Sequence, residues 1–243
     1  MPRFFADKEN IKDNSLTILG DDAFHIARSL RMAVGDSLTV SDGDGTDYFC
    51  RLSKIRDEEC ECEIIESKKS EVESPAKITL FMAYPKGDKL ELVIQKAVEL
   101  GAAKIVPFES SRCIKRPKAD QVDKQLSRLQ RIAEEAAKQC GRSRIPTVSS
   151  PVSFKEMLSL SKESALPLFC YEAEDGMSLR AALSAHPADS ISIVVGSEGG
   201  FSEEEADGAV SAGLISVSLG KRILRCETAP LFALAAIAYE LEL

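Results

Sequence analysis

The sequence predicts a mixed α/β protein that begins with a small β-rich unit and continues as a domain built on a mostly parallel sheet. In residues 1–70, short strand-like segments surround the turn signal D-G-D-G at residues 42–45, which is typical of a β-hairpin. From Lys77 onward, short apolar runs alternate with helix-like stretches, as in a parallel sheet covered by helices on both faces.

The boundary between the two parts is predicted from a change in composition. Residues 68–75 are polar, contain few apolar side chains and end in Pro75, as linkers often do. We therefore place the first domain at residues 1–72 and the second at residues 76–243.

The first domain is predicted to be a compact β-barrel. Its strands are expected at residues 3–5, 16–19, 38–40, 48–52 and 60–65. A short helix begins at Asp21, with Ala23, Ile26, Ala27 and Leu30 on its inner side. Small β-barrels often bind nucleic acid, although a fold alone does not establish a function.

The second domain is predicted to alternate strands and helices. We expect strands at residues 78–83, 105–108, 168–171, 191–195 and 215–219. We expect helices at residues 90–100, 120–140, 179–183, 202–212 and 231–241. The last helix is apolar nearly all round, which indicates burial in the core or against a second subunit.

Charge is distributed unevenly along the chain. The formal net charge is −8, but residues 112–144 contain ten Lys and Arg against four Asp and Glu. Such a run is typical either of a patch that follows phosphates or of a solvated helix face. Charge alone does not choose between these interpretations.

Cysteine content and hydropathy indicate the cellular compartment of the protein. Seven cysteines without a repeating spacing favour free thiols in a reducing compartment, and hence a cytoplasmic protein. Cys60 and Cys62 would share one face of a strand, but the only histidines are His25 and His186, so no metal site is expected. The longest apolar run, residues 229–239, is too short to span a bilayer, so no membrane partner is expected either.

Two of the predicted strands end at a glycine and open onto loops that could form one ligand site. The first loop is G-S-E-G-G at residues 196–200. Ligands of open α/β sheets bind beyond the carboxyl ends of the strands, where backbone N–H groups are presented. The spacing matches neither a dinucleotide fingerprint nor a Walker A loop, and a simple strand-to-helix turn remains an alternative. Ser202 and Glu203 to Glu205 read as the cap and first turn of a helix.

The second loop, L-G-K-R-I-L-R-C-E-T-A at residues 219–229, mixes apolar and charged side chains. Ile223 and Leu224 could pack on a flat ligand while Arg225 faces developing negative charge. Thr228 is a candidate N-cap for the last helix.

Together these stretches resemble a known family. V-V-G-S-E-G-G-F-S-x-x-E at 194–205, followed by S-L-G-K-R-I-L-R-C-E-T-A at 218–229, is similar to the RsmE family. Residues 86–101, 111–113 and 135–142 agree with it as well. This chain has Ser197 where the family usually has proline, and Cys226 where it often has threonine.

The resemblance implies an N-terminal PUA-like β-barrel followed by a SPOUT-type parallel α/β domain with a C-terminal trefoil knot. It implies a homodimer that uses S-adenosyl-L-methionine to methylate N3 of a uridine in 16S ribosomal RNA. The partner would be this RNA or the small ribosomal subunit. Two alternatives stay open: ribose 2′-O methylation by the same class of enzyme, and a non-catalytic RNA-binding protein.

The resemblance also assigns candidate cofactor-binding residues, whereas basic residues of the run 112–144 and of the first domain are the candidates for RNA binding. Those expected to bind the cofactor are Leu168, Tyr171, Gly196, Glu198, Gly199, Gly200, Leu219, Gly220, Ile223, Leu224 and Thr228. Those expected to bind RNA are Arg3, Arg28, Arg31, Arg112, Lys115, Arg116, Arg142 and Arg144.

The expected chemistry singles out a cation and a base. Deprotonated uridine spreads its charge over O2 and O4, which a cation would stabilise. Arg225 is the first candidate for this role, with Arg142 and Arg144 as rivals. The proton acceptor is open between Glu227, taken as the catalytic partner of Arg225, and Glu198.

Overall fold

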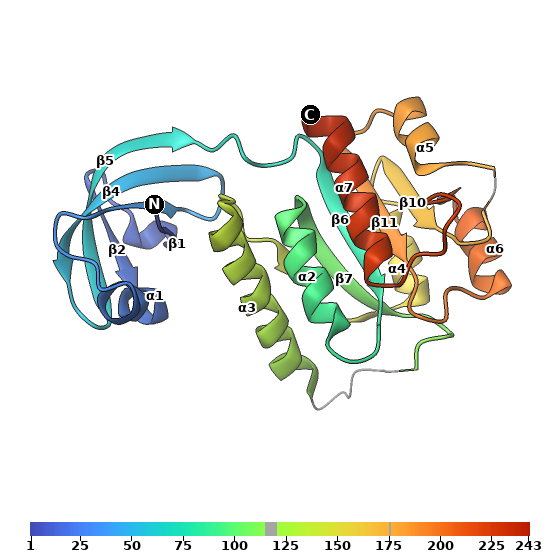
Figure 1. Ribbon diagram of the computed structural model, residues 1–243, viewed down its shortest axis with the longest axis horizontal. Helices are drawn as coiled ribbons and strands as arrows, with labels where there is room; N and C mark the ends of the chain where they lie inside the picture. Colours follow the sequence, from blue (N-terminus) through green and yellow to red (C-terminus); the bar gives the residue numbers. More distant parts are fainter. Residues whose placement is uncertain (115–120, 175) are drawn as a thin grey trace. The chain divides into compact units, whose positions relative to one another are not determined.

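The computed structural model describes residues 1–114, 121–174 and 176–243 (Figure 1). The chain divides into two compact units. The first contains Met1–Glu73 and Ala137–Ile145, and the second contains Ser74–Ala136 and Pro146–Leu243. The predicted second domain, 76–243, included the segment that belongs to the first unit.

The first unit is built on a five-stranded sheet that curls on itself (Figure 1). Its order is β1 (Arg3–Phe5), β3 (Ser37–Ser41), β4 (Thr46–Ile55), β5 (Glu59–Lys69) and β2 (Ser15–Leu19). β1 pairs with β3 in parallel, and the other pairings are antiparallel. Two register shifts in the β4–β5 pairing bend the sheet, as bulges do.

The core of this unit is one cluster of buried side chains to which every strand of the sheet contributes. Phe4, Leu16, Leu38 and Leu52 are among its buried side chains. Cys60 and Cys62 are buried in the same cluster, so they pack as core residues.

The predicted helix at Asp21 is present but changes character after one turn. α1 (Gly20–Phe24) continues as a π-helical turn, η2 (His25–Ser29). Ala23 and Ile26 are buried as expected, whereas Leu30 is exposed. The wider π turn shifts the phase of the side chains, and this accounts for the wrong prediction at Leu30.

The second unit contains a parallel sheet. Its order is β12 (Ile215–Val217), β10 (Leu166–Cys170), β11 (Ser190–Val195), β6 (Lys77–Ala83), β7 (Ala102–Glu109) and β8 (Thr147–Val148), and β9 (Val152–Ser153) pairs with β7. The pairings are all parallel, as the alternation of strands and helices predicted.

Helices cover this sheet. Their bounds are α2 (Lys89–Glu99), α3 (Val122–Cys140), α4 (Phe154–Ser161), α5 (Leu179–Ala185), α6 (Glu203–Ser211) and α7 (Thr228–Glu242). α2 and α7 lie in front of the sheet and contact each other, and α4 lies behind it against β6, β7 and β11 (Figure 1). The helix α4 and the short strands β8 and β9 were not predicted.

The last helix is only partly buried. Pro230, Ala233, Leu234 and Ile237 of α7 face the interior, whereas Tyr239 is exposed. No helix within the described ranges is long and apolar enough to cross a membrane. Among the described residues, Cys50, Cys60, Cys62, Cys113, Cys170 and Cys226 are free thiols.

Candidate functional site

A cavity of about 480 Å³ lies at the carboxyl edge of the parallel sheet. It is lined by Lys89, Cys170, Tyr171, Glu172, Val195, Gly196, Ser197, Glu198, Gly199, Gly200, Ser218, Leu219, Gly220, Lys221, Arg222, Ile223, Leu224, Arg225, Cys226 and Ala229. Both glycine loops therefore contribute to one cavity.

The sheet register explains why segments far apart in sequence meet here. β10 lies between β11 and β12, and Cys170 at its end is level with Val195 of β11 and Val217 of β12. Because all three strands are parallel, the loops that follow them leave from the same edge. The cavity occupies the position that ligands take in open α/β sheets.

The first loop is packed closely by other parts of the protein. A Cβ atom at Gly199 would lie 2.9 Å from Cβ of Arg112, and the Arg112 guanidinium donates a 3.0 Å hydrogen bond to the Gly199 carbonyl. Gly200 has a φ of +63°, and a Cβ there would lie 2.1 Å from Oε1 of Glu172. Glycine is therefore required at Gly199 by the packed Cβ and carbonyl oxygen of Arg112, and at Gly200 by the left-handed φ.

The helix after this loop begins as predicted. Ser202 is the N-cap of α6 and forms a reciprocal capping box with Glu205. Glu205 also accepts hydrogen bonds from the backbone N–H and the hydroxyl of Ser111, at 2.7 and 2.8 Å. This carboxylate thus holds the segment that carries Arg112 beside the glycine loop.

Lys89 connects the two loops, although the predicted site did not include it. Its ammonium lies 3.0 Å from a carboxylate oxygen of Glu198 in the first loop and 3.1 Å from one of Glu227 in the second. Hydrogen bonds to Glu198 and then to Glu227 raise the pKa of Lys89 above its usual range. This residue is thus a charged link across the cavity.

The two carboxylates held by Lys89 are ionised more readily than usual. Burial by itself would raise the pKa of Glu198, but backbone N–H donors, including that of Lys86, and Lys89 together lower it. The pKa of Glu227 is lowered first by its own backbone N–H and also by Cys226 and Lys89. A lowered pKa makes each carboxylate a weaker proton acceptor.

The thiol of Cys226 lies between these charges. It donates a hydrogen bond to Glu227 over 3.2 Å and lies 3.7 Å from the Lys89 ammonium. Burial raises its pKa to about 12, so the group stays a neutral thiol at physiological pH.

The cations of the second loop remain available to a ligand. Lys221, Arg222 and Arg225 line the cavity and are exposed. Within the described part of the chain, none of the three forms an ion pair. Ile223 is 88% exposed and Leu224 is half-buried, so the loop offers apolar surface beside its cations.

Leu168, Glu227 and Thr228 were predicted as site residues but do not line the cavity. Leu168 is fully buried inside β10, so only its neighbours at the strand end reach the cavity. Thr228 is the first residue of α7, and Glu227 precedes it as an N-cap without a side-chain cap bond. The prediction that Thr228 is the N-cap of α7 is therefore wrong. The Glu227 side chain does not cap the helix and instead forms an ion pair with Lys89.

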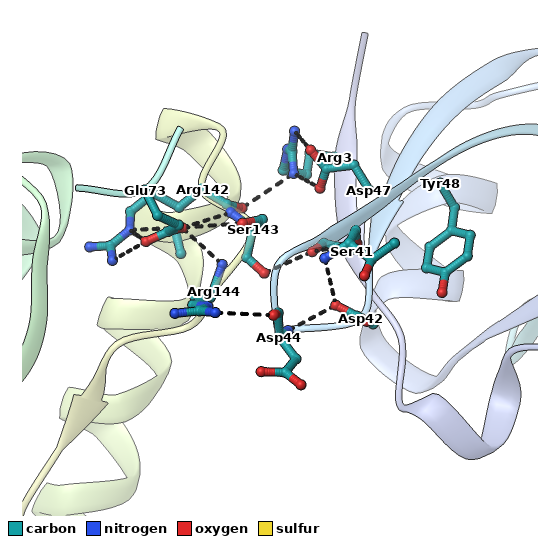
Figure 2. A network of polar contacts seen from close by, with 12 residues as sticks. Arg3, Ser41, Asp42, Asp44, Asp47, Tyr48, Glu73, Arg142, Ser143 and Arg144 are labelled. Atoms are coloured by element: carbon teal, nitrogen blue, oxygen red, sulfur yellow. Dashed lines mark hydrogen bonds and ion pairs between the residues drawn. The ribbon is translucent and has the colours of Figure 1, made fainter. Parts of the chain in front are cut away.

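Two of the arginines predicted to bind RNA are paired with carboxylates in the structure (Figure 2). Arg3 forms two hydrogen bonds with Asp47, at 2.6 and 3.0 Å, and its side chain is 15% exposed. Arg142 is buried and binds Glu73 at 2.6 Å. A buried, paired guanidinium cannot also grip a phosphate without breaking its pair.

The other predicted RNA contacts are more accessible. Arg31 and Arg112 are exposed, and Arg28 is exposed but paired with Asp57. Arg144 is exposed, and its guanidinium donates a 3.4 Å hydrogen bond to the Asp44 carbonyl in the β3–β4 turn (Figure 2). Lys115 and Arg116 lie outside the described residues.

The basic run is partly neutralised elsewhere as well. Lys138 pairs with Asp22 and Arg128 with Glu91, each at 2.8 Å. No group of three or more His, Cys, Asp or Glu that could hold a metal occurs among the described residues.

Comparison with known protein families identifies both parts of the chain. Residues 72–238 match the RNA methyltransferase domain family, and residues 18–65 match the RNA methyltransferase PUA domain family. The chain thus combines a PUA domain with an RNA methyltransferase domain.

Individual relatives narrow this class. Ribosomal RNA small subunit methyltransferase E of Bacillus subtilis is 34% identical over 251 aligned positions, covering 100% of this chain and 98% of the relative. The crystal structure of ribosomal RNA small subunit methyltransferase E from Neisseria gonorrhoeae, bound to S-adenosyl methionine, has a TM-score of 0.87 at 34% identity and covers 99% of this chain and 98% of that one. A methyltransferase from Legionella pneumophila, with the cofactor bound, has a TM-score of 0.86 at 29% identity, covering 98% and 97% of the two chains. The chain belongs to the ribosomal RNA small subunit methyltransferase E family, the RsmE family.

Proposed function

We propose that this protein uses S-adenosyl-L-methionine to methylate N3 of a uridine in 16S ribosomal RNA. The observation that carries the proposal is the cavity formed by both glycine loops in a chain that aligns end to end with RsmE proteins. Solved relatives with S-adenosyl methionine bound support the choice of cofactor.

The cavity suits such a cofactor. Its volume of about 480 Å³ lies within the range of about 300–1,000 Å³ typical of small-molecule sites. Ser197 lines it, and its buried hydroxyl has no hydrogen-bond partner in the described chain, so a polar ligand group could satisfy it. Gly220, where a Cβ atom would meet nothing within 4 Å, would allow a ligand to approach the backbone.

Chemistry by the protein consists mainly of positioning and electrostatic stabilisation. When bound, the cofactor supplies an activated methyl group on a sulfonium. Lys89 holds Glu198 and Glu227, and with them the walls on which the cofactor would lie. In-line transfer depends on such fixed geometry for much of its rate.

Arg225 is proposed to stabilise the uridine anion. It is exposed, lines the cavity and is unpaired among the described residues, so its charge is available to O2 or O4 of the deprotonated base. Lys221 and Arg222 on the same loop are now stronger rivals than Arg142, whose guanidinium is held by Glu73.

RNA phosphates are proposed to contact Arg31, Arg112 and Arg144, with Arg28 available if it exchanges Asp57 for a phosphate. Each phosphate contact should lower the affinity by roughly 0.7–0.9 log units per log unit of salt. Binding of 16S RNA measured between 50 and 300 mM salt tests this assignment. A nearly flat response would contradict it.

The rest of the proposal concerns the homodimer, the C-terminal trefoil knot and the cellular location of the protein. Tyr239 on α7 is 70% exposed and lies beside a second cavity between α5 and α7, which supports a partner copy at this helix. Light scattering should then give the mass of a dimer. The C-terminal trefoil knot and a cytoplasmic location accompany the proposed membership of the SPOUT class.

Titration calorimetry with S-adenosylhomocysteine tests whether the protein is an enzyme of this kind. Binding in the micromolar range is expected. No binding of S-adenosylhomocysteine would favour the non-catalytic RNA-binding alternative. In a separate analysis of the methylated RNA, a ribose-methylated product would favour 2′-O methylation.

A further inference from the structure

Glu172 is a carboxylate of the cavity that does not bind Lys89. Glu172 follows β10 by two residues and lines the cavity together with Tyr171 and Cys170. Its carboxylate lies directly against Gly200, where a Cβ atom would be 2.1 Å from Oε1. The end of β10 thus presents a negative charge to the cavity beside the first glycine loop.

The other carboxylates near the cavity already have partners. Glu198 binds Lys89 and the backbone N–H of Lys86, and Glu227 binds Lys89 and the Cys226 thiol. Within the described residues, Glu172 makes neither a hydrogen bond nor an ion pair. It is therefore the carboxylate there with free hydrogen-bonding capacity.

Neighbouring cations do not neutralise it. Lys221, Arg222 and Arg225 line the same cavity, yet none of them pairs with Glu172. An unpaired carboxylate accepts hydrogen bonds only, so its ligand must carry O–H or N–H donors or a positive charge. Carboxylates at the ends of parallel strands bind ribose hydroxyls in other nucleotide sites.

We propose that Glu172 is a cofactor-binding residue that takes a hydroxyl or a cationic group of S-adenosyl-L-methionine. This inference rests on the proposed function, because it requires the cofactor to occupy this cavity. The cofactor offers three groups of the required chemistry: the ribose hydroxyls, the α-ammonium and the sulfonium. The proposal also gives Gly200 a role, since any larger residue would displace the Glu172 carboxylate.

The test compares Glu172→Gln with the wild type by titration calorimetry. Gln keeps the shape of the side chain but removes its charge. We expect binding of S-adenosyl-L-methionine to weaken about tenfold, as for the loss of one charge-assisted hydrogen bond. Glu203→Gln is the matched control, because Glu203 is an exposed carboxylate that does not line the cavity. It should bind as the wild type does.

Two further ligands identify the group that Glu172 contacts. S-adenosylhomocysteine lacks the sulfonium charge, and 5′-methylthioadenosine also lacks the α-ammonium. Loss for all three ligands assigns the ribose, loss for the first two assigns the ammonium, and loss for S-adenosyl-L-methionine alone assigns the sulfonium.

Unchanged binding of S-adenosyl-L-methionine by Glu172→Gln would overturn the proposal. An equal loss in Glu203→Gln would overturn it too, because the effect would then be a general change in charge. A failure of the wild type to bind any of the three ligands would instead refute the proposed function, so the two failures are distinguishable.

Discussion

Lys89 shows how much of the site depends on one side chain that lies far from the glycine motifs in sequence. It follows Gly87 and Asp88 at the start of α2, and its ammonium reaches carboxylates more than 100 residues away in the chain. Glu198 and Glu227 would repel each other without it. The glycine loops are therefore held at a fixed separation by charge as well as by backbone geometry.

Replacing Lys89 by methionine should weaken cofactor binding about tenfold, because the two carboxylates lose their shared partner. Lys89→Arg keeps the positive charge and should lose less than about threefold. Calorimetry with S-adenosylhomocysteine measures both variants. Wild-type affinity in Lys89→Met would show that the link does not shape the cavity.

The same link predicts a pH dependence. Both carboxyls have a folded-state pKa below their ordinary value of 4.5, so their contribution to stability is complete above that pH. It should be lost as the pH falls below 4.5 and through the lower folded-state pKa. Urea unfolding of the wild type and Lys89→Met, followed from pH 7 to pH 3, should therefore give a difference that shrinks in acid. A difference that grows toward low pH would have the wrong sign.

At the scale of elements, the end of β11 and the start of α6 place the first glycine loop. The turn is closed by a 3.0 Å hydrogen bond from the Gly200 N–H to the Ser197 carbonyl, and Ser202 then caps the helix. Arg112, from the segment after β7, closes the outer side of the turn. The loop is therefore fixed from within and from a neighbouring segment.

Gly199→Val should abolish cofactor binding while leaving the first unit folded. Its side chain would meet Arg112 Cβ at 2.9 Å and the Arg112 carbonyl oxygen at 3.2 Å, so the loop must move. Circular dichroism checks folding and calorimetry checks binding. Gly208→Ala in the middle of α6, where a Cβ meets nothing within 4 Å, is the control and should bind normally.

The sequence predicted this level of structure better than it predicted contacts. Glycines after apolar runs mark strand ends, so the two loops and their shared edge were predicted from local pattern. The Lys89 link and the place of Glu172 depend on side chains brought together from distant segments, which periodicity does not encode. Leu30 was misplaced because a single π turn changes the phase of a helix.

For the whole molecule, the division into units does not follow chain order. Residues 137–145 return to the first unit after a long excursion through the second. Glu73 holds them there, because its carboxylate accepts hydrogen bonds from the side chains of Arg142 and Ser143 and from the backbone of Ser143 and Arg144 (Figure 2). Ser41 adds a 2.8 Å hydrogen bond to the Ser143 carbonyl.

Glu73→Ala should destabilise the first unit by about 1.5–3 kcal/mol, because the half-buried carboxylate accepts charge-assisted hydrogen bonds that alanine cannot replace. Hydrogen exchange should accelerate in residues 141–145 and in β3. Glu71→Ala, at an exposed carboxylate two residues earlier, is the control. Unchanged exchange in Glu73→Ala would show that other contacts hold the segment.

Mass analysis of nucleosides from small ribosomal subunits that lack the modification tests whether the protein methylates N3 of a uridine. These subunits are treated with the protein and S-adenosyl-L-methionine. We expect one new methylated uridine that carries its methyl group on N3, and a rate reduced at least about a hundredfold in Arg225→Ala. A methyl group on a ribose hydroxyl, or no methylation by a protein that binds the cofactor, would contradict this expectation.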